Sequence, residues 1–177
     1  MSIHLFALDP GLRGCGTAWF DETGKLMQVE YVRNTVKTGT GPKAWAGYLD
    51  HGRCRADIFI SEVPQVYRAG ASKGDPDDLI QLAGVVGLFT GIIEADEYLG
   101  VKPREWKGQV PKDVHHARLV KILTPEEMAM VERAAPPSLR HNVLDAIGIG
   151  RYWFDLQRKA APVIEKPVRT PRRRFTR

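Results

Sequence analysis

Three acidic residues stand at the edges of apolar segments, and they constrain the fold more than any other feature of the chain. Asp9 begins an Asp-Pro-Gly turn after one apolar run, Glu62 ends a second run, and Asp145 lies inside a third. An ionised carboxylate in such a place is costly unless a cation compensates it. We therefore expect a fold that brings the three carboxylates together around a divalent metal ion.

The N-terminal third of the sequence predicts a strand-rich unit. Two apolar runs are separated by the turn at Pro10 and Gly11, and a third follows the turn-forming segment 21–24. These runs predict an antiparallel meander. The expected elements are strands at 3–9, 14–20 and 26–32, a short helix at 42–53 and a fourth strand at 56–63.

The rest of the sequence combines helical patterns with one further strand. Apolar residues from Leu79 to Ile93 recur on one face of a long predicted helix, which starts at an acidic, proline-containing turn. The expected elements are this helix at 75–97, a final strand at 98–102, and helices at 111–123, 125–134 and 139–158.

This order of elements predicts an α/β fold of the ribonuclease-H-like type. A meander joined to βαβ crossovers gives a mixed five-stranded sheet flanked by helices. The first and fourth strands can be neighbours in such a sheet, which brings Asp9 to Glu62, and the last helix then delivers Asp145. Two Mg²⁺ ions roughly 3.5 to 4 Å apart would turn the repulsion among the carboxylates into binding energy.

Length and composition favour one domain over residues 1–157. A chain of 177 residues with 43% hydrophobic content can bury one sizeable core. No apolar stretch reaches the ~18 to 20 residues of a membrane span, so we expect no membrane association. Cys15 and Cys54 are too few for a disulfide framework, which favours a reducing cytoplasm, either bacterial or that of a phage host.

Positive charge is concentrated in the C-terminal segment 158–177. This segment carries a net charge of +7, the rest of the chain carries −2, and prolines interrupt it. It cannot bury much apolar surface, so we expect a flexible basic tail. Polyanion contact through Arg172, Arg173 and Arg174 is favoured over a merely solubilising role, because binding to phosphates releases counterions.

Several motifs resemble the RuvC-type Holliday-junction resolvases. Segment 7–16 contains a strand ending in Asp-Pro-Gly, segment 60–63 has a Glu that ends the fourth strand, and segment 144–150 has an Asp-Ala pair in a C-terminal helix. The basic segments 101–108 and 112–114 look like that family's strand-to-helix region. The resemblance spans about residues 3 to 156.

The resemblance implies a Mg²⁺-dependent endonuclease that resolves four-way DNA junctions by paired nicks. It implies catalytic and metal-binding roles for Asp9, Glu62 and Asp145, two bound ions with Mn²⁺ as a substitute, and a homodimer, since a junction has two symmetry-related strands. Asp-Pro-Gly also opens the phosphate-binding strand of actin-like sugar kinases. That fold needs a second domain and further Gly-rich loops, so we expect no nucleotide cofactor.

One position departs from the family pattern. RuvC-type enzymes carry an acid or a histidine one helical turn before the last Asp, whereas this chain has Asn142 there, preceded by His141. Both are candidate catalytic residues, because side chains three or four apart share a helix face. Asn142 can bind metal through its carbonyl oxygen without adding charge, and His141 can bind metal or transfer a proton. His141 is equally consistent with a solvated position near the start of the helix.

Cationic side chains are candidates for contacts with the DNA backbone. The resemblance implies that Lys107 and Lys112 approach the scissile phosphate, where Lys107 would stabilise developing charge. Arg13, in the turn after Asp9, can hold a phosphate. The alternative for all three is a solvated surface position.

The loop after Glu62 contains an aromatic residue between basic ones. Tyr67 is the candidate for stacking on a base at the junction centre, with Arg68 and Lys73 beside it on the DNA. The alternative is that Tyr67 packs back on the domain. His115 and His116, which lack a spaced acidic partner in the sequence, are expected to be surface residues rather than ligands.

The long predicted helix contains Gly84, Gly87 and Gly91, each unfavourable in a helix by about 1 kcal/mol relative to Ala. We therefore expect a close approach there, either by the sheet or by a second copy of the chain.

Two other functions remain open at this stage. One is a non-catalytic nucleic-acid-binding protein on the same fold, with Asn142 marking a lost site. The other is a nuclease with the same chemistry that debranches DNA, including phage DNA, and cuts flaps as well as junctions.

Overall fold

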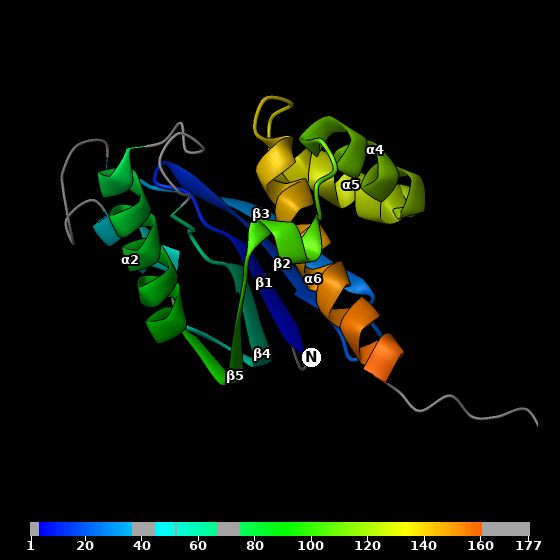
Figure 1. The fold of residues 1–177 in the computed structure, drawn as a ribbon, viewed down its shortest axis with the longest axis horizontal. Coiled ribbons are helices and arrows are strands. Elements are labelled where there is room, and N and C mark those ends of the chain that lie inside the picture. The colour runs from blue at the N-terminus through cyan, green and yellow to red at the C-terminus, as the bar shows by residue number, and fades with distance from the viewer. Residues whose placement is uncertain (1–3, 37–44, 52, 67–74, 161–177) are drawn as a thin grey trace, which may run out of the picture.

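The protein is built around one mixed sheet between two helical layers. The computed structural model describes residues 4–36, 45–51, 53–66 and 75–160 (Figure 1). The strands, in the sheet order β3-β2-β1-β4-β5, are β1 (Leu5–Asp9), β2 (Gly14–Phe20), β3 (Leu26–Arg33), β4 (Cys54–Glu62) and β5 (Ile93–Val101). The helices are the 3₁₀ helix η1 (Ala46–His51) and α2 (Pro76–Ile92), α3 (Pro103–Trp106), α4 (Lys112–Ile122), α5 (Pro125–Ala134) and α6 (Arg140–Ala160). The predicted ribonuclease-H-like fold class is confirmed.

Strand pairing places two of the three acids at the same end of the sheet. The strands β1, β2 and β3 form an antiparallel meander, whereas β4 is parallel to both β1 and β5. The last residues paired between β1 and β4 are Leu8 and Ser61. Asp9 and Glu62 each follow one residue later, so parallel pairing leaves them side by side.

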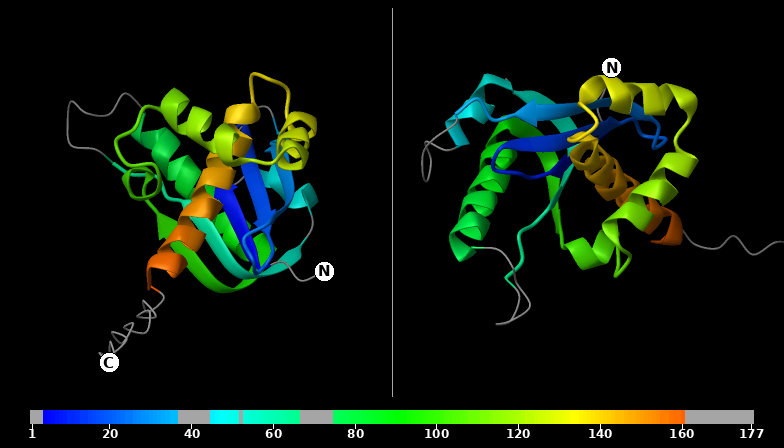
Figure 2. Two further views of the ribbon diagram at one scale, coloured as in Figure 1. Left: turned by 90° about the vertical axis from the view of Figure 1, so that its right-hand side faces the viewer. Right: turned by 90° about the horizontal axis from the view of Figure 1, so that it is seen from above.

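Alternation along the strands separates two cores. In β1, Leu5 and Ala7 pack into the core under α5 and α6, while Phe6 and Leu8 pack into the core under α2 and η1. The further views in Figure 2 show α2 on one face of the sheet and α4, α5 and α6 on the other. Because side chains alternate with a period of two, Asp9 belongs to the α6 face.

The expected boundary between the long helix and the last strand is wrong. The helix α2 ends at Ile92, and β5 begins at the next residue, Ile93, with no loop between them. Pairing with β4 along the whole stretch from Cys54–Ile93 to Glu62–Val101 draws these residues into the sheet. This tertiary pairing outweighs the helical pattern that suggested a helix to residue 97.

Other boundaries differ less from expectation. The predicted helix at 42–53 is the shorter η1, and the single turn α3 was not predicted. The helix α6 continues to Ala160, so residues 158–160 of the expected tail are helical; residues 161–177 lie outside the described residues. Among the described residues, no helix is both long and apolar enough to cross a membrane.

Candidate active site

The three acids predicted to cluster meet on the α6 face of the sheet. Asp9 ends β1, Glu62 ends β4, and Asp145 lies in the second turn of α6, where only 3% of the residue is exposed. In β4, Ile58 and Ile60 also face the α6 core, so Glu62 continues their side of the strand. Three segments that are distant in sequence therefore supply one acidic centre.

Burial, and then mutual repulsion, opposes the ionisation of the strand-borne acids. Burial raises the pKa of Asp9 well above its usual value, and the nearby charges of Asp145 and Glu62 raise it further, while Lys112 and Lys107 oppose the shift. Burial also raises the pKa of Glu62, against the opposing effect of Lys107. A further cation bound beside these carboxylates would favour their ionised form.

A glycine allows α6 to approach the sheet closely enough to join the site. Gly16 pairs with Asp9 across β1 and β2. A Cβ atom at Gly16 would lie 2.0 Å from the backbone oxygen of Asn142 and 2.9 Å from the backbone nitrogen of Val143. The backbone of α6 therefore rests directly on β2 beside Asp9, which sets the depth of Asp145. This role of Gly16 was not predicted.

The turn after Asp9 is tied to the opposite helical layer. The buried Tyr48 of η1 donates a hydrogen bond of 2.6 Å from its hydroxyl group to the carbonyl oxygen of Gly11. The side-chain amide of Asn34 donates to the carbonyl oxygen of Leu12 at 2.9 Å. These contacts fix the path of the chain immediately beyond Asp9.

Glu62 is held by two neighbouring residues at the end of α3. The indole Nε1 of Trp106 donates a 2.8 Å hydrogen bond to Oε2 of Glu62, and Nζ of Lys107 lies 3.8 Å from the same oxygen. The ammonium group of Lys107 also lies 4.8 Å from the centre of the Trp106 ring. The structure therefore brings Lys107 to the acids, and it adds Trp106, which no sequence pattern marked.

Asp145 is held by two residues of α4. Nζ of Lys112 lies 2.7 Å from Oδ2, and Nε2 of His116 lies 2.8 Å from Oδ1. The expectation that His115 and His116 are surface residues is wrong, because both are partly buried and His116 contacts an acid of the centre. The spacing of four between Lys112 and His116 was the available sequence signal for a shared face.

The donor set suits a hard divalent cation. Three carboxylates supply the oxygen ligands that Mg²⁺ prefers, and the raised pKa of Asp9 marks a place where a cation would stabilise the ionised form. In the described part of the chain, no three His, Cys, Asp or Glu side chains converge tightly enough to share an ion. Glu62 and Asp145 are paired with lysines there, so metal binding requires these flexible side chains to turn aside.

The remaining predicted residues divide between the site, the surface and the undescribed segments. Burial lowers the pKa of the partly buried His141, and Lys112 lowers it further while Asp145 opposes, so His141 lies within electrostatic reach of the centre. The side chain of Asn142 is partly buried beside it, and Arg13 is exposed in the turn. The residues predicted to contact DNA through the loop after Glu62 and the C-terminal segment lie outside the described residues: Tyr67, Arg68, Lys73, Arg172, Arg173 and Arg174.

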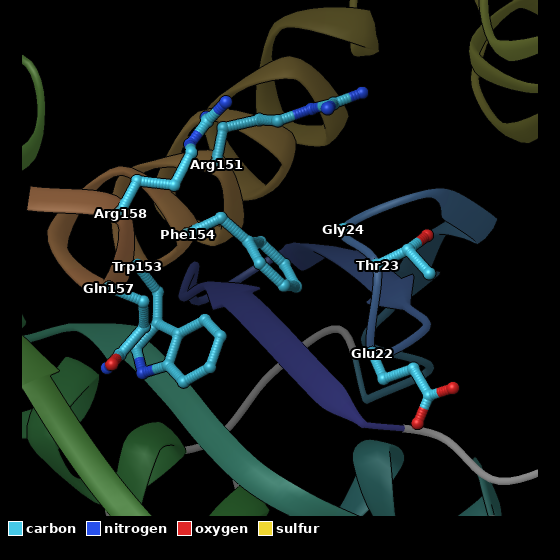
Figure 3. Close-up of a pocket in the computed structure, with 8 residues that line it drawn as sticks. All are labelled: Glu22, Thr23, Gly24, Arg151, Trp153, Phe154, Gln157 and Arg158. Carbon is cyan, nitrogen blue, oxygen red and sulfur yellow. The ribbon is translucent and has the colours of Figure 1, made fainter. Parts of the chain in front are cut away.

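A separate pocket lies away from the acids, between the β2–β3 turn and the C-terminal half of α6 (Figure 3). Phe154 lies across from Gly24, where a Cβ atom would be 3.2 Å from the ring. None of the three acids lines this pocket. Its lining residues are Glu22, Thr23, Gly24, Arg151, Trp153, Phe154, Gln157 and Arg158.

Comparison with known proteins identifies the fold. No family model and no curated protein matches the sequence. Solved structures do match. RuvC of Thermus thermophilus aligns with a TM-score of 0.52 and 16% identity over 88% of this chain and 96% of that chain. The same protein in complex with a Holliday junction substrate gives 0.53 and 15%, over 91% and 98%.

A third match comes from another lineage. The yeast mitochondrial Holliday junction resolvase Ydc2 aligns with a TM-score of 0.50 and 10% identity, over 89% of this chain and 82% of that chain. The identities are low, so these likenesses concern the fold. The chain has the fold of the RuvC-type resolvases, as its sequence motifs suggested.

Proposed function

We propose that this chain, which has the RuvC-type resolvase fold, is a metal-dependent endonuclease that nicks four-way DNA junctions. The observation that supports the proposal is the proximity of Asp9, Glu62 and Asp145 at one end of the sheet, where their charges interact. Likeness to a protein captured with a Holliday junction supports branched DNA as the substrate class. Two symmetry-related nicks require two active centres, so we propose that the chain acts as a homodimer.

Asp9, Glu62 and Asp145 are the proposed ligands of two divalent ions, Mg²⁺ or Mn²⁺, with Asn142 as a further oxygen donor. When bound, such ions activate water and stabilise the leaving 3′ oxygen of a phosphodiester. The protein's own contribution is to hold the carboxylates in place. Strand pairing fixes Asp9 and Glu62, and the contact of α6 with Gly16 fixes Asp145.

Lys107 and Lys112 are the proposed phosphate-binding cations. Each is ion-paired with one acid of the centre, at 3.8 Å for Lys107 and 2.7 Å for Lys112. A phosphodiester carries negative charge to the same place, and it gains charge as water attacks in line and the bond from phosphorus to the 3′ oxygen breaks. Lysine side chains there stabilise that charge. No covalent intermediate with the protein is needed.

Cleavage of a synthetic four-way junction with Mg²⁺ tests the proposal. The parent should nick two opposing strands. Asp9→Asn should lose at least about a thousandfold in rate, because metal-assisted charge stabilisation is worth several kcal/mol. Asp96→Asn, on the exposed edge of β5, is the matched control and should retain activity.

The outcomes separate the competing functions. Equal cleavage by the parent and Asp9→Asn would rule out this active site. Binding of the junction without cleavage would favour a non-catalytic DNA-binding protein. A parallel panel of flap, RNA–DNA hybrid and linear duplex distinguishes a general debranching nuclease, which would cut flaps as fast as junctions.

A further inference from the structure

Both carboxylate oxygens of Asp145, which lies in α6, are contacted by side chains of α4. Oδ1 lies 2.8 Å from Nε2 of His116, and Oδ2 lies 2.7 Å from Nζ of Lys112. His116 and Lys112 are four residues apart in α4, so they occupy one face of that helix. A carboxylate accepts hydrogen bonds, so in the tautomer with the proton on Nε2 His116 donates to Oδ1.

The two contacts differ in how firmly they hold. The His116 side chain is 15% exposed and ends in a rigid ring, whereas the Lys112 side chain is 49% exposed and has a long flexible stem. Ordering a lysine side chain costs more conformational entropy than ordering an imidazole. The contact of Lys112 is therefore readily exchanged, and that of His116 persists.

The backbone that carries His116 is itself fixed against α6. A Cβ atom at Gly148 would lie 2.8 Å from Nε2 of His115 and 3.2 Å from a methyl carbon of Leu119. His115 also packs edge-on against Trp106, with ring centres 5.1 Å apart. Gly148 thus lets α4 lie close to α6, which sets His116 opposite Asp145.

We propose that His116 is a positioning residue of the acidic centre. It holds Oδ1 of Asp145 and thereby presents Oδ2 to a divalent cation. Among the described residues, neither the Asn142 nor the His141 side chain forms a hydrogen bond with the Asp145 carboxylate, so this role belongs to α4 rather than to α6. The inference rests on the proposed function in that it takes the centre to bind a divalent ion.

The test measures Mn²⁺ affinity directly, without cleavage. Protein freed of metal with EDTA is titrated with Mn²⁺, and free Mn²⁺ is followed by electron paramagnetic resonance. His116→Ala should weaken binding about tenfold or more, the usual effect of removing a partner that orients a metal ligand. His116→Gln, whose side-chain amide can donate to the same oxygen, should recover most of the affinity.

Val114→Ala is the matched control. It shortens an exposed side chain on the same helix, so Mn²⁺ affinity should stay within about twofold of the parent. Circular dichroism melting confirms that each variant is folded. Equal losses for Val114→Ala and His116→Ala would overturn the inference, since they would indicate a general effect of altering α4.

The same titrations separate this inference from the proposed function. Unchanged Mn²⁺ affinity in His116→Ala, with junction cleavage by the parent, overturns the role of His116 alone. Loss of affinity in His116→Ala, with no cleavage of any branched DNA by the parent, supports the role of His116 and contradicts the nuclease. Absence of Mn²⁺ binding by the parent overturns both.

Discussion

The helices on the two faces of the sheet use glycine in opposite ways. On the site face, all residues of α6 from Val143 to Gly150 are buried, and Gly148 and Gly150 admit neighbouring side chains that a Cβ atom would strike. On the other face, α2 exposes Gly87 and Gly91, and no atom of the described residues lies within 4 Å of a Cβ atom there. Gly84 alone in α2 is packed closely, against Trp45.

Glycine in these helices therefore indicates either close packing, where a Cβ atom would not fit, or an exposed position with no neighbour. Around α6, glycine is required because backbone and aromatic rings meet at close range, and this closeness puts Asp145 among the other acids. In the exposed part of α2, glycine lowers helix stability without any packing gain inside the chain. A close approach therefore exists at Gly84, where Trp45 rather than the sheet makes the contact. At Gly87 and Gly91 no part of the described chain approaches, and approach by a second copy stays a prediction.

The largest expected effect contrasts an acid from each helix. Asp145→Asn should reduce the rate of junction nicking by about a thousandfold, because it removes one charged ligand of the proposed metal centre. Asp78→Asn, on the exposed first turn of α2, should leave the rate within about twofold. Rates measured on a labelled four-way junction check this, and similar losses in both variants would contradict a site confined to the α6 face.

The next effect concerns space on the site face. Gly16→Ala should lower the free energy of unfolding by about 1 to 3 kcal/mol, because the added methyl group meets the backbone of α6 rather than a flexible side chain. Urea denaturation measures it. Junction nicking should fall as well, since α6 must move away from β2. A Gly16→Ala protein as stable as the parent would show that α6 shifts freely.

A smaller effect follows from the raised pKa of Asp9. The unfolded carboxyl ionises from about pH 4, whereas the folded one holds its proton to higher pH, so the parent loses stability as pH rises through that interval. In EDTA, the melting temperature of Asp9→Asn should therefore gain relative to that of the parent as the pH is raised from 4 to 7. Added Mg²⁺ should shrink the gain, and a gain independent of pH would contradict this account.

The smallest expected effect is that of Gly87→Ala, which also serves as the control for the pH dependence of the Asp9 variant. It changes no titrating group, so its effect on melting temperature should be the same at both pH values. The free energy of unfolding should rise by about 0.5 to 1 kcal/mol, the helix preference of Ala over Gly. Sedimentation velocity then measures whether the variant is a monomer or a dimer. A destabilised Gly87→Ala protein that also loses a dimer would show that a second copy covers this face.

Much of the fold could be predicted because local patterns dominate it. Alternating apolar residues and turn signals located the meander, and Thr124 followed by Pro125 and Glu127 marks the start of α5 through a capping box. The end of α2 could not be located, since Ile92 and Ile93 continue an apolar helical face. Only pairing with β4 assigns Ile93 to a strand.

The site was predictable only in part for a similar reason. Asp9, Glu62 and Asp145 carry a chemical signal, which is charge beside apolar sequence. Trp106 carries none and His116 carries only its spacing of four from Lys112, because their contacts with the acids join residues 44 and 29 positions apart in the chain. Such contacts depend on how α3 and α4 lie across the sheet, which residue spacing alone does not encode.

The contact of α6 with Gly16 limits how the protein can adapt to a bound molecule. The backbones of α6 and β2 are in direct contact there, with no side chain between them, so α6 cannot tilt or slide without losing its contact with β2. Adjustment falls to the lysine stems at positions 107 and 112, which can rotate while the acids stay still. The molecule therefore presents a stiff template with movable cations, and a molecule bound at this site must conform to the protein more than the protein conforms to it.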